Sequence, residues 1–452
     1  MITNLHLKLA SSPGQPCLSI DTPPSVTIFV GPNNAGKSQA LRELFAFCQS
    51  GQANQAAFIV DKLTFAAGDP EIVRAEFEAA LVPIKLEENV PPKYSRLGLG
   101  GEIVQVVKEN YFRARNEPNE NSASFAQWYL RYFTLNLDGP SRIGLVNPQA
   151  RGDLKRPATP LARLLCDNPK RESLRAILYD AFQMYFALDA QAGDQLSIRF
   201  GMAPPPDERS FNDEAIDYMR KARGMEAVSD GVKAFTGILL QVSVGSPKVI
   251  IIDEPEAFLH PSLALKLGKE LAKAAALENK HVFAATHSPQ FIMGAILSGA
   301  KVNIVRLTYQ DGVGAARLLS SSELATLMQD TLLRSVGVLS GLFYDHVIVG
   351  EADADRAFYQ EINERLLAAN DPRGIHHALF LNAVGKDTIS RIIEPLRRLG
   401  IPAAAIVDID IFNQGGDPWT RHLRACAVPE KEHQPYGARR SLAHTALSSA
   451  DT

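Results

Sequence analysis

Residues 31–38 have the sequence GPNNAGKS, which matches the phosphate-binding pattern G-x-x-x-x-G-K-[ST]. The apolar run VTIFV precedes this loop, and the helical run SQALRELFAF begins at its last residue. The motif requires this order of strand, loop and helix, because backbone N–H groups of the glycine turn and the helix N-terminus together surround phosphate oxygens. The alternative is a chance glycine turn before a helix, and the flanking strand and helix disfavour it.

The loop residues indicate how ATP would be held. Lys37 is expected to reach the β and γ phosphates, and the hydroxyl of Ser38 is expected to hold Mg²⁺. The predicted ATP-binding residues of this stretch are Gly31, Asn33, Asn34, Gly36, Lys37, Ser38 and Gln39.

A second stretch, VIIIDEPEAFLHP at 249–261, ends a buried strand with two acidic residues. Asp253 is expected to order the Mg²⁺ shell, and Glu254 to orient or deprotonate the attacking water, which is the division of labour that phosphoryl transfer needs. An acidic pair at a strand end is also typical of a solvated turn. The glycine loop upstream favours the catalytic interpretation.

Two shorter stretches extend this set. VSDGVKA at 228–234 would place Ser229 and the Gly231 amide at a helix start, where phosphate can bind, although a capped helix alone also explains it. ATHSPQF at 285–291 ends the next strand with His287, which can hydrogen-bond a γ-phosphate or serve as a structural donor. The order and spacing of all four stretches favour the nucleotide interpretation.

Composition limits the class of protein. The chain has 452 residues, of which 46% are apolar, and this length predicts two or three folded domains. No apolar run approaches the roughly 20 residues that cross a bilayer, so no membrane segment is expected. Four scattered cysteines without CxxC spacing indicate neither a disulfide framework nor zinc, and a cytoplasmic location is expected. The net charge of -3 means that any DNA contact must come from local basic patches or metal bridging.

Apolar runs alternate with helical runs over most of the chain, which predicts an α/β protein with a parallel sheet covered on both faces. We expect an ATPase domain at 1–335, with an insertion of helices and Pro- and Asn-rich loops at about 51–225. A second, smaller α/β domain is expected at 340–452.

The four stretches, in this order, resemble the ABC-type ATPase head of the SMC and RecF-like group, and especially of the OLD (overcoming lysogenization defect) ATPase-nucleases. This resemblance implies that two heads sandwich ATP as a homodimer or within a higher oligomer, with Ser229 and Gly231 completing the partner's site. It also implies that Glu254 is the hydrolytic base and that His287 senses the γ-phosphate. The Q-loop glutamine of the family has no clear counterpart here.

A second acidic site is predicted in the C-terminal domain. IVDIDIF at 406–412 is expected to be the end of a strand with Asp408 and Asp410 on one face, while Glu351 ends an earlier strand. If these carboxylates converge within about 4 Å, each like-charged pair is repelled by around 4 kcal/mol at an effective dielectric near 20, and a divalent cation would remove that penalty.

This arrangement resembles the Toprim fold, with a glutamate after the first strand and D-x-D after the third. GEADADRAFY at 350–359 resembles the OLD form of the first motif, aligning Glu351 and Asp355, with Ala352 where a glycine is usual. The resemblance implies that Glu351, Asp355, Asp408 and Asp410 are catalytic. Glu351, Asp408 and Asp410 would bind Mg²⁺, Mn²⁺ or a similar ion for DNA cleavage, and Lys386 is a candidate phosphate contact. The alternative is that the acidic residues of GEADADRAFY only complement the dipole of the helix that they begin.

The Toprim resemblance is incomplete after Asp410. We expect one short helix at about 418–425 and no buried strand there, so a truncated or diverged Toprim domain is predicted, with Asp417, Glu430, Lys431, Glu432 and Arg439 as unranked candidates.

Two functional hypotheses follow from the sequence. The first is an ATP-regulated, metal-dependent DNA endonuclease in bacterial anti-phage defence or DNA processing. The second is a DNA-binding or scaffolding ATPase whose inactive Toprim remnant recruits a second defence protein. A third possibility, the ATPase subunit of an importer, is disfavoured, because a transporter ATPase does not need the acidic set Glu351, Asp408 and Asp410.

Overall fold

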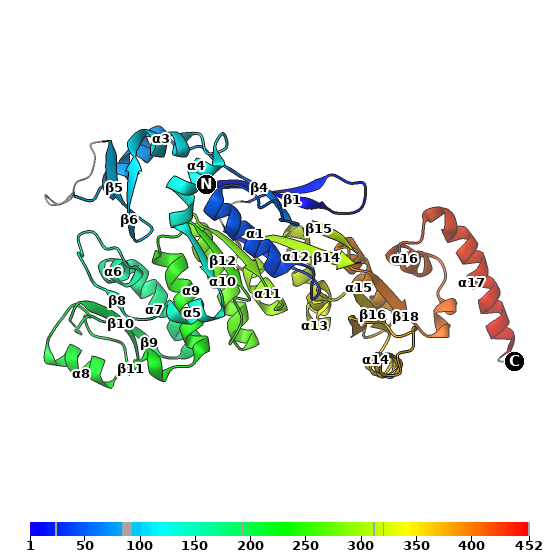
Figure 1. Cartoon of the computed structure of the whole chain (residues 1–452). Helices are drawn as coiled ribbons and strands as arrows, with labels where there is room; N and C mark the ends of the chain where they lie inside the picture. The colour runs from blue at the N-terminus through cyan, green and yellow to red at the C-terminus, as the bar shows by residue number, and fades with distance from the viewer. Residues whose placement is uncertain (23–24, 84–92, 192, 311, 320, 451–452) are drawn as a thin grey trace. The chain divides into compact units, whose positions relative to one another are not determined.

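The computed structural model describes residues 1–22, 25–83, 93–191, 193–310, 312–319 and 321–450 (Figure 1). The chain divides into two compact units. Unit 1 comprises Met1–Phe29 and Gly36–Ser321, and unit 2 comprises Val30–Ala35 and Ser322–Thr452.

A six-stranded sheet forms the centre of unit 1. Its order is β15 (Val313–Leu319), β14 (Asn303–Gln310), β3 (Ser25–Val30), β13 (His281–Ala285), β12 (Val249–Asp253) and β7 (Thr134–Leu137). Strands β3, β13, β12 and β7 are parallel, while β14 and β15 form an antiparallel pair. All residues of β3 and β13 are buried, which explains why these strands appear in the sequence as continuous apolar runs.

Four helices pack on or beside this sheet: α1 (Lys37–Ser50), α9 (Asp230–Val244), α10 (Pro261–Leu277) and α11 (Pro289–Leu297). Helices α10 and α11 approach each other closely because glycines face the contact. A Cβ atom on Gly268 would lie 2.2 Å from the carbonyl oxygen of Phe291, and one on Gly294 would lie 1.9 Å from that of Leu265. Any side chain at either glycine would therefore push α10 and α11 apart. These helices directly follow the turns that come after β12 and β13.

The predicted insertion at 51–225 contains helices and also strands. Its helices include α2 (Pro70–Ala80) and α7 (Asn168–Phe182), and α7 ends before β9 (Tyr185–Asp189). Gln183 stops the helix in the left-handed conformation, with φ of 55°. The other helices here are α3 (Lys108–Asn116), α4 (Ser122–Trp128), η1 (Leu130–Phe133), α5 (Gly139–Gly144), α6 (Pro160–Cys166) and α8 (Asp213–Lys221).

Three small sheets surround the central one. The first has the order β2 (Cys17–Asp21), β1 (Ile2–Ala10) and β4 (Val60–Phe65), which confirms the strand expected at the chain start. The second is the hairpin β5 (Tyr94–Leu99) and β6 (Glu102–Val107). The third contains β8 (Gln149–Ala150), β9, β10 (Gln195–Gly201) and β11 (Arg223–Gly224), followed by η2 (Met225–Ala227).

Unit 2 contains a parallel sheet with the order β17 (Ala378–Asn382), β16 (His346–Gly350) and β18 (Ala403–Ile406). Its helices are α12 (Ser321–Gln329), α13 (Thr331–Val336), η3 (Val338–Phe343), α14 (Asp353–Ala368), α15 (Lys386–Arg398), η4 (Ile409–Asn413), α16 (Asp417–Ala425) and α17 (Glu430–Ala450). Helix α16 confirms the short helix expected near 418–425, whereas α17 was not predicted. Its apolar residues show almost no helical periodicity, so the sequence gives little signal for it.

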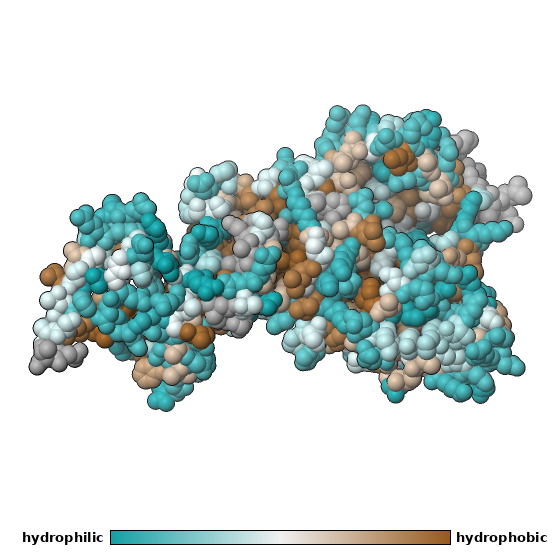
Figure 2. Space-filling view, turned by 180° about the vertical axis from the view of Figure 1, so that it is seen from behind, coloured by the Kyte–Doolittle hydropathy of each residue, from teal (hydrophilic) through white to brown (hydrophobic). Residues whose placement is uncertain are grey.

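Hydrophilic side chains cover most of the face shown in Figure 2, and hydrophobic ones form separate patches. Within the part of the chain that the structure describes, no helix combines the length and apolarity needed to span a bilayer. None of the cysteines Cys17, Cys48, Cys166 and Cys426 forms a disulfide.

Candidate functional site

The glycine loop joins β3 to α1, as its sequence predicts. Three of its residues have positive φ, namely Gly31 at 146°, Asn34 at 61° and Gly36 at 91°. Gly36 precedes the first residue of α1 in the left-handed conformation, and a Cβ atom there would lie 2.8 Å from Cδ1 of Ile59. This geometry turns the backbone sharply into the helix N-terminus, which is the arrangement that binds phosphate.

Lys37 lies in the first turn of α1 and is only 6% exposed. Burial lowers the pKa of its ammonium group to about 8, while the carboxylates of Asp253 and Glu254 act in the opposite direction. The acidic turn after β12 is therefore the electrostatic partner of this lysine. The two motifs, more than two hundred residues apart in the sequence, meet at the carboxyl end of the central sheet, where α/β proteins place their sites.

The acidic turn has an unusual backbone conformation at the proposed base. Glu254 has φ of 52°, and its N–H donates to the carbonyl of Ala285 at 2.8 Å. Its own carbonyl accepts a hydrogen bond from the Arg142 guanidinium. Left-handed backbone at a residue other than glycine costs about 1–3 kcal/mol and persists only where surrounding contacts hold it. These bonds hold the exposed Glu254 side chain beside the end of β13.

His287 follows β13 and belongs to the same electrostatic neighbourhood. Burial lowers its pKa, Lys37 lowers it further, and Glu254 and Asp253 raise it. The structure therefore brings Lys37, Asp253, Glu254 and His287 together, as the motif order indicated.

Two residues of this neighbourhood were not identified from the sequence. Glu256 accepts hydrogen bonds from the Thr286 hydroxyl at 2.7 Å and from the His287 N–H at 3.0 Å, and burial raises its pKa. Its other carboxylate oxygen is buried and has no hydrogen-bond partner among the described residues. The sequence could have indicated Glu256, because it lies two residues after Glu254 in the same acidic stretch.

Arg142 is the second such residue. It lies on α5 in the insertion, is 3% exposed, and contacts the turn 112 positions further on. Burial lowers its pKa, and the carboxylates of Glu256, Glu254 and Asp253 oppose that shift. No local pattern around Arg142 points to this contact, because only the fold brings α5 to the acidic turn.

The predicted helix start at Ser229 is confirmed. Ser229 precedes the first residue of α9, is exposed, and makes no side-chain capping hydrogen bond. Gly231 is buried against the acidic turn, where a Cβ atom would lie 2.6 Å from the carbonyl oxygen of Phe258. Among the other residues predicted to contact ATP, Asn33 and Asn34 are exposed to solvent. The Gln39 side chain instead hydrogen-bonds to Glu43 and Arg42 within α1.

The acids of unit 2 are arranged differently from the prediction. The strand β18 ends at Ile406, so Asp408 and Asp410 do not lie on one face of a strand. Asp408 precedes η4 and Asp410 lies inside it, because the chain leaves the sheet before the D-x-D pair. The Asp408 N–H donates to the Glu351 carboxylate at 3.4 Å, so these two residues are neighbours.

Asp410 is paired with Lys386 at the start of α15, and this contact raises the pKa of the lysine. Asp355 accepts the Ala352 N–H at 2.9 Å and caps α14, which agrees with the simpler helix-end interpretation. Among the described residues, no group of three His, Cys, Asp or Glu side chains is placed to hold a metal ion. Glu351, Asp408 and Asp410 have the right oxygen ligands, but in this arrangement they do not fit the divalent ion that the resemblance implies.

After Asp410, helix α17 makes polar contacts to η4. Arg440 on α17 donates to the carbonyl of Phe412 at 2.7 Å, and His444 lies 3.0 Å from the Asn413 side chain. The described residues after Asp410 contain no strand, as predicted. The candidates Asp417, Glu430 and Glu432 lie in the first turns of α16 and α17, where they complement the helix dipoles.

Comparisons with known proteins support the two-domain interpretation. Residues 206–293 match the family model described as "AAA domain, putative AbiEii toxin, Type IV TA system", a range that includes Ser229, the acidic turn and His287. Residues 342–410 match the model described as "Overcoming lysogenization defect protein-like, TOPRIM domain", a range that includes all four predicted Toprim acids. No curated protein matches the chain in sequence.

Solved structures show only weak similarity. The SMC head bound to the C-terminal winged-helix domain of ScpA is 14% identical with a TM-score of 0.40, and the match covers 73% of this chain and 99% of that one. The SMC head of Thermotoga maritima is 13% identical with a TM-score of 0.33, covering 71% and 99%. The Pyrococcus furiosus SMC head with ScpA is 12% identical with a TM-score of 0.34, covering 73% and 98%. Similarity at this level carries no functional information.

The sheets and the two family matches confirm the predicted fold class at the level of α/β domains. The chain combines an AAA-type ATPase domain with a C-terminal Toprim domain like that of the overcoming-lysogenization-defect proteins.

Proposed function

We propose that the protein binds and hydrolyses ATP through the site at the carboxyl end of the central sheet. The observation that carries this proposal is the convergence of Lys37 with Asp253, Glu254 and His287. A buried lysine is costly unless it meets negative charge, and the phosphates of ATP would supply that charge in addition to the carboxylates.

Each residue then has a role that its position supports. Lys37 and the loop amides hold the β and γ phosphates, and Glu254 takes a proton from the attacking water. His287 hydrogen-bonds a γ-phosphate oxygen. Ser38 and Asp253 fit Mg²⁺, because hydroxyl and carboxylate oxygens are its ligands, and the ion would neutralise charge on the phosphates. Glu256 orients the His287 backbone, and Arg142 orients the Glu254 backbone.

Steady-state ATP turnover by the full chain tests this proposal. The Lys37→Ala and Glu254→Gln variants should each lose roughly 100-fold or more of kcat, the size expected for phosphate positioning and general-base catalysis. Glu254→Gln should still bind ATP, because its side chain does not hold the phosphates. Turnover by Glu254→Gln within about twofold of the natural chain would remove Glu254 from the mechanism.

A second copy of the chain is proposed to complete the ATP site. Ser229 is exposed at the start of α9 with no side-chain capping bond, so its hydroxyl is available to an incoming phosphate. Light scattering on the Glu254→Gln variant should then show ATP-dependent dimers. A Ser229→Arg change should abolish them, because the bulky cation would occupy the space of the partner's γ-phosphate.

For the Toprim domain we propose an ATP-regulated DNA endonuclease, in the setting of bacterial anti-phage defence or DNA processing. The OLD-like family match over 342–410 supports this proposal, with Glu351, Asp355, Asp408 and Asp410 as its catalytic residues. The ion pair of Asp410 with Lys386 favours the alternative, in which the domain binds DNA without cutting it and recruits a second defence protein.

Nicking of supercoiled plasmid separates these alternatives. The natural chain, Asp408→Ala and Lys37→Ala are compared with Mg²⁺ or Mn²⁺, with and without ATP. Metal-dependent nicking that disappears in Asp408→Ala supports the endonuclease. Absence of nicking by a chain that turns over ATP contradicts the endonuclease and leaves the recruiting ATPase as the proposed function.

A further inference from the structure

A cavity of about 690 Å³ lies in unit 1 where β12 begins, at the opposite end of that strand from the acidic turn. It is open to solvent on one side and is bordered by the end of α2, the hairpin β5–β6 and the loop between α9 and β12. The charged residues that line it are Arg156, Arg163, Lys248 and Glu102. The cavity therefore has three basic side chains and one acidic one.

The two arginines of this cavity contact carbonyl oxygens, and none of its three basic side chains forms an ion pair with a carboxylate among the described residues. Arg163 donates to the carbonyls of Pro157 at 3.1 Å and Val244 at 3.4 Å, and Arg156 donates to that of Leu81 at 3.4 Å. Carbonyl oxygens satisfy hydrogen bonds without cancelling a full positive charge. No ion pair to Arg156, Arg163 or Lys248 exists among the described residues of the chain.

A buried lysine beside the cavity responds to the same positive potential. Lys280 donates to the carbonyls of Gln241 and Gly245, each at 2.8 Å. Burial lowers its pKa to about 7, and Lys248, Lys170 and Arg163 act in the same direction against Glu278. Burial is the largest cause of this shift, and the smaller contributions of Lys248, Lys170 and Arg163 reflect the positive charges gathered near the cavity.

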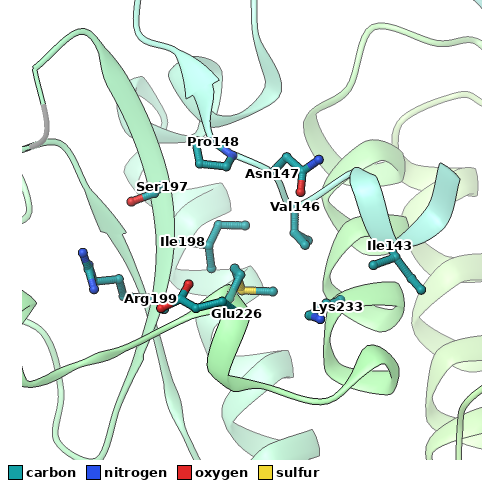
Figure 3. A pocket seen from close by; sticks show the side chains of 11 residues that line it. Ile143, Val146, Asn147, Pro148, Ser197, Ile198, Arg199, Glu226 and Lys233 are labelled. Carbon is teal, nitrogen blue, oxygen red and sulfur yellow. The ribbon is translucent and has the colours of Figure 1, made fainter. Parts of the chain in front are cut away.

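A second cavity of the same unit gives a useful contrast (Figure 3). It measures about 440 Å³ and is lined by Arg199, Glu226 and Lys233 among others. Its basic residues are neutralised, because Arg199 pairs with Asp189 at 2.6 Å and Lys233 with Asp230 at 2.9 Å. Unpaired positive charge therefore distinguishes the larger cavity from this second one.

Apolar groups form the rest of the larger cavity, including Leu81, Val82, Ile103 and Phe133. We propose that this cavity is a second ligand site, which binds a small phosphorylated molecule with an apolar or planar body, the chemical class of a nucleoside monophosphate. The phosphate contacts Arg156, Arg163 and Lys248, and the body lies against the apolar wall. The volume is within the usual range of roughly 300–1,000 Å³ for small-molecule sites.

The location of the cavity gives the ligand a route to the ATP site. Gly245 lines the cavity and ends α9, whose first turn follows Ser229. Lys248 lines it and directly precedes β12, which ends at Asp253. Helix α9 and strand β12 thus connect the cavity to Ser229 and to Asp253.

Calorimetric titration of the full chain tests this proposal, with Lys37→Ala as the background so that the glycine loop does not bind the probes. The probes are the common ribonucleoside monophosphates, adenosine and inorganic phosphate. At least one monophosphate should bind, and more tightly than adenosine. Adding Arg156→Gln and Lys248→Gln should weaken it roughly tenfold or more, since two charge-assisted contacts are lost. Lys301→Gln, which removes an exposed lysine outside the cavity, should leave binding unchanged.

Thermal melting of each variant separates loss of binding from loss of folding, and the single Lys248→Gln change replaces the double variant if the latter melts early. The proposal is overturned if no monophosphate binds at millimolar concentration, or if binding survives Lys248→Gln and Arg156→Gln unchanged. It is also overturned if a single-stranded oligonucleotide, and no monophosphate, loses affinity in these variants, since the ligand would then be a nucleic-acid strand. Because the ATP site is disabled in the background, failure here is distinct from failure of the ATPase proposal.

Discussion

The proposed ATP site and the Toprim acids both lie at the carboxyl ends of parallel strands, yet they differ in how the charges are balanced. In the ATP site, a buried lysine faces Asp253 and Glu254, and a second layer of Glu256 and Arg142 holds the turn. In unit 2, Glu351 neighbours Asp408, while Asp410 is already neutralised by Lys386. The first site is ready for an anionic substrate, whereas the second lacks the free carboxylate cluster that would hold a cation.

The two acidic pairs show that an acidic motif alone does not define a metal site. Asp253 is the last residue of the packed strand β12 and Glu254 follows it directly, so the sheet determines where both residues lie. Asp408 and Asp410 come after the strand has ended, in a short 3-10 turn that an adjacent lysine can reach. The position of the strand end, and not the spacing of the acids, decides the outcome.

The largest expected effect separates the two sites directly. Glu254→Gln should lower the kcat of ATP hydrolysis roughly 100-fold or more, whereas Asp408→Asn should leave it within about twofold, because only Glu254 lies in the ATP site. Phosphate release under saturating ATP is the measurement. An equal loss in both variants would contradict the separation of the two sites.

The second expected effect is on metal binding by unit 2. Lys386→Met removes the ammonium group that pairs with Asp410. Without nucleotide, the variant should therefore bind Mn²⁺ with severalfold higher affinity than the natural chain. Equilibrium dialysis with Mn²⁺ gives the two affinities. Lys301→Met, which removes a lysine of unit 1, is the control and should leave the affinity unchanged. Weaker binding in Lys386→Met would mean that the lysine supports the metal site.

The third expected effect concerns the support of His287. Glu256→Ala leaves the Thr286 hydroxyl and the His287 N–H without their acceptor, so kcat should fall by about tenfold with little change in KM. Glu256→Gln keeps an accepting oxygen and should restore most of the rate. If the glutamine variant is as slow as the alanine variant, the charge of Glu256 matters more than its hydrogen bonds.

The smallest expected effect is on the pH dependence of stability. The pKa of Lys280 is lowered to about 7 in the folded chain, so between pH 7 and 9 the unfolded chain binds more protons at this residue. The free energy of unfolding of the natural chain should therefore rise relative to that of Lys280→Met, by on the order of 1 kcal/mol across this window.

Urea unfolding at both pH values measures this difference. Lys386→Met is the matched control, because the pKa of the half-buried Lys386 is raised by Asp410 and its contribution does not change between pH 7 and 9. A constant or falling difference for Lys280→Met would show that Lys280 is charged in the folded chain throughout this range.

The sequence was sufficient to predict the central strands and the ATP motifs, since each is a continuous run with its own signal. The strands β12, β13, β16, β17 and β18 all lie within apolar runs that were predicted to be strands. Arg142 could not be predicted, because its role depends on a contact across 112 positions. The pairing of Lys386 with Asp410 was also missed, since the lysine was expected to contact phosphate.

Counting bound Mn²⁺ by electron paramagnetic resonance tests the contrast between the sites most directly. The natural chain, Lys37→Ala and Asp408→Ala are titrated with Mn²⁺, with and without a non-hydrolysable ATP analogue. Tight binding should appear only with the analogue, disappear in Lys37→Ala and persist in Asp408→Ala. Tight binding by the nucleotide-free natural chain that is lost in Asp408→Ala would show that the Toprim acids form a metal site on their own. It would contradict the contrast between the two sites and favour the endonuclease over the recruiting ATPase.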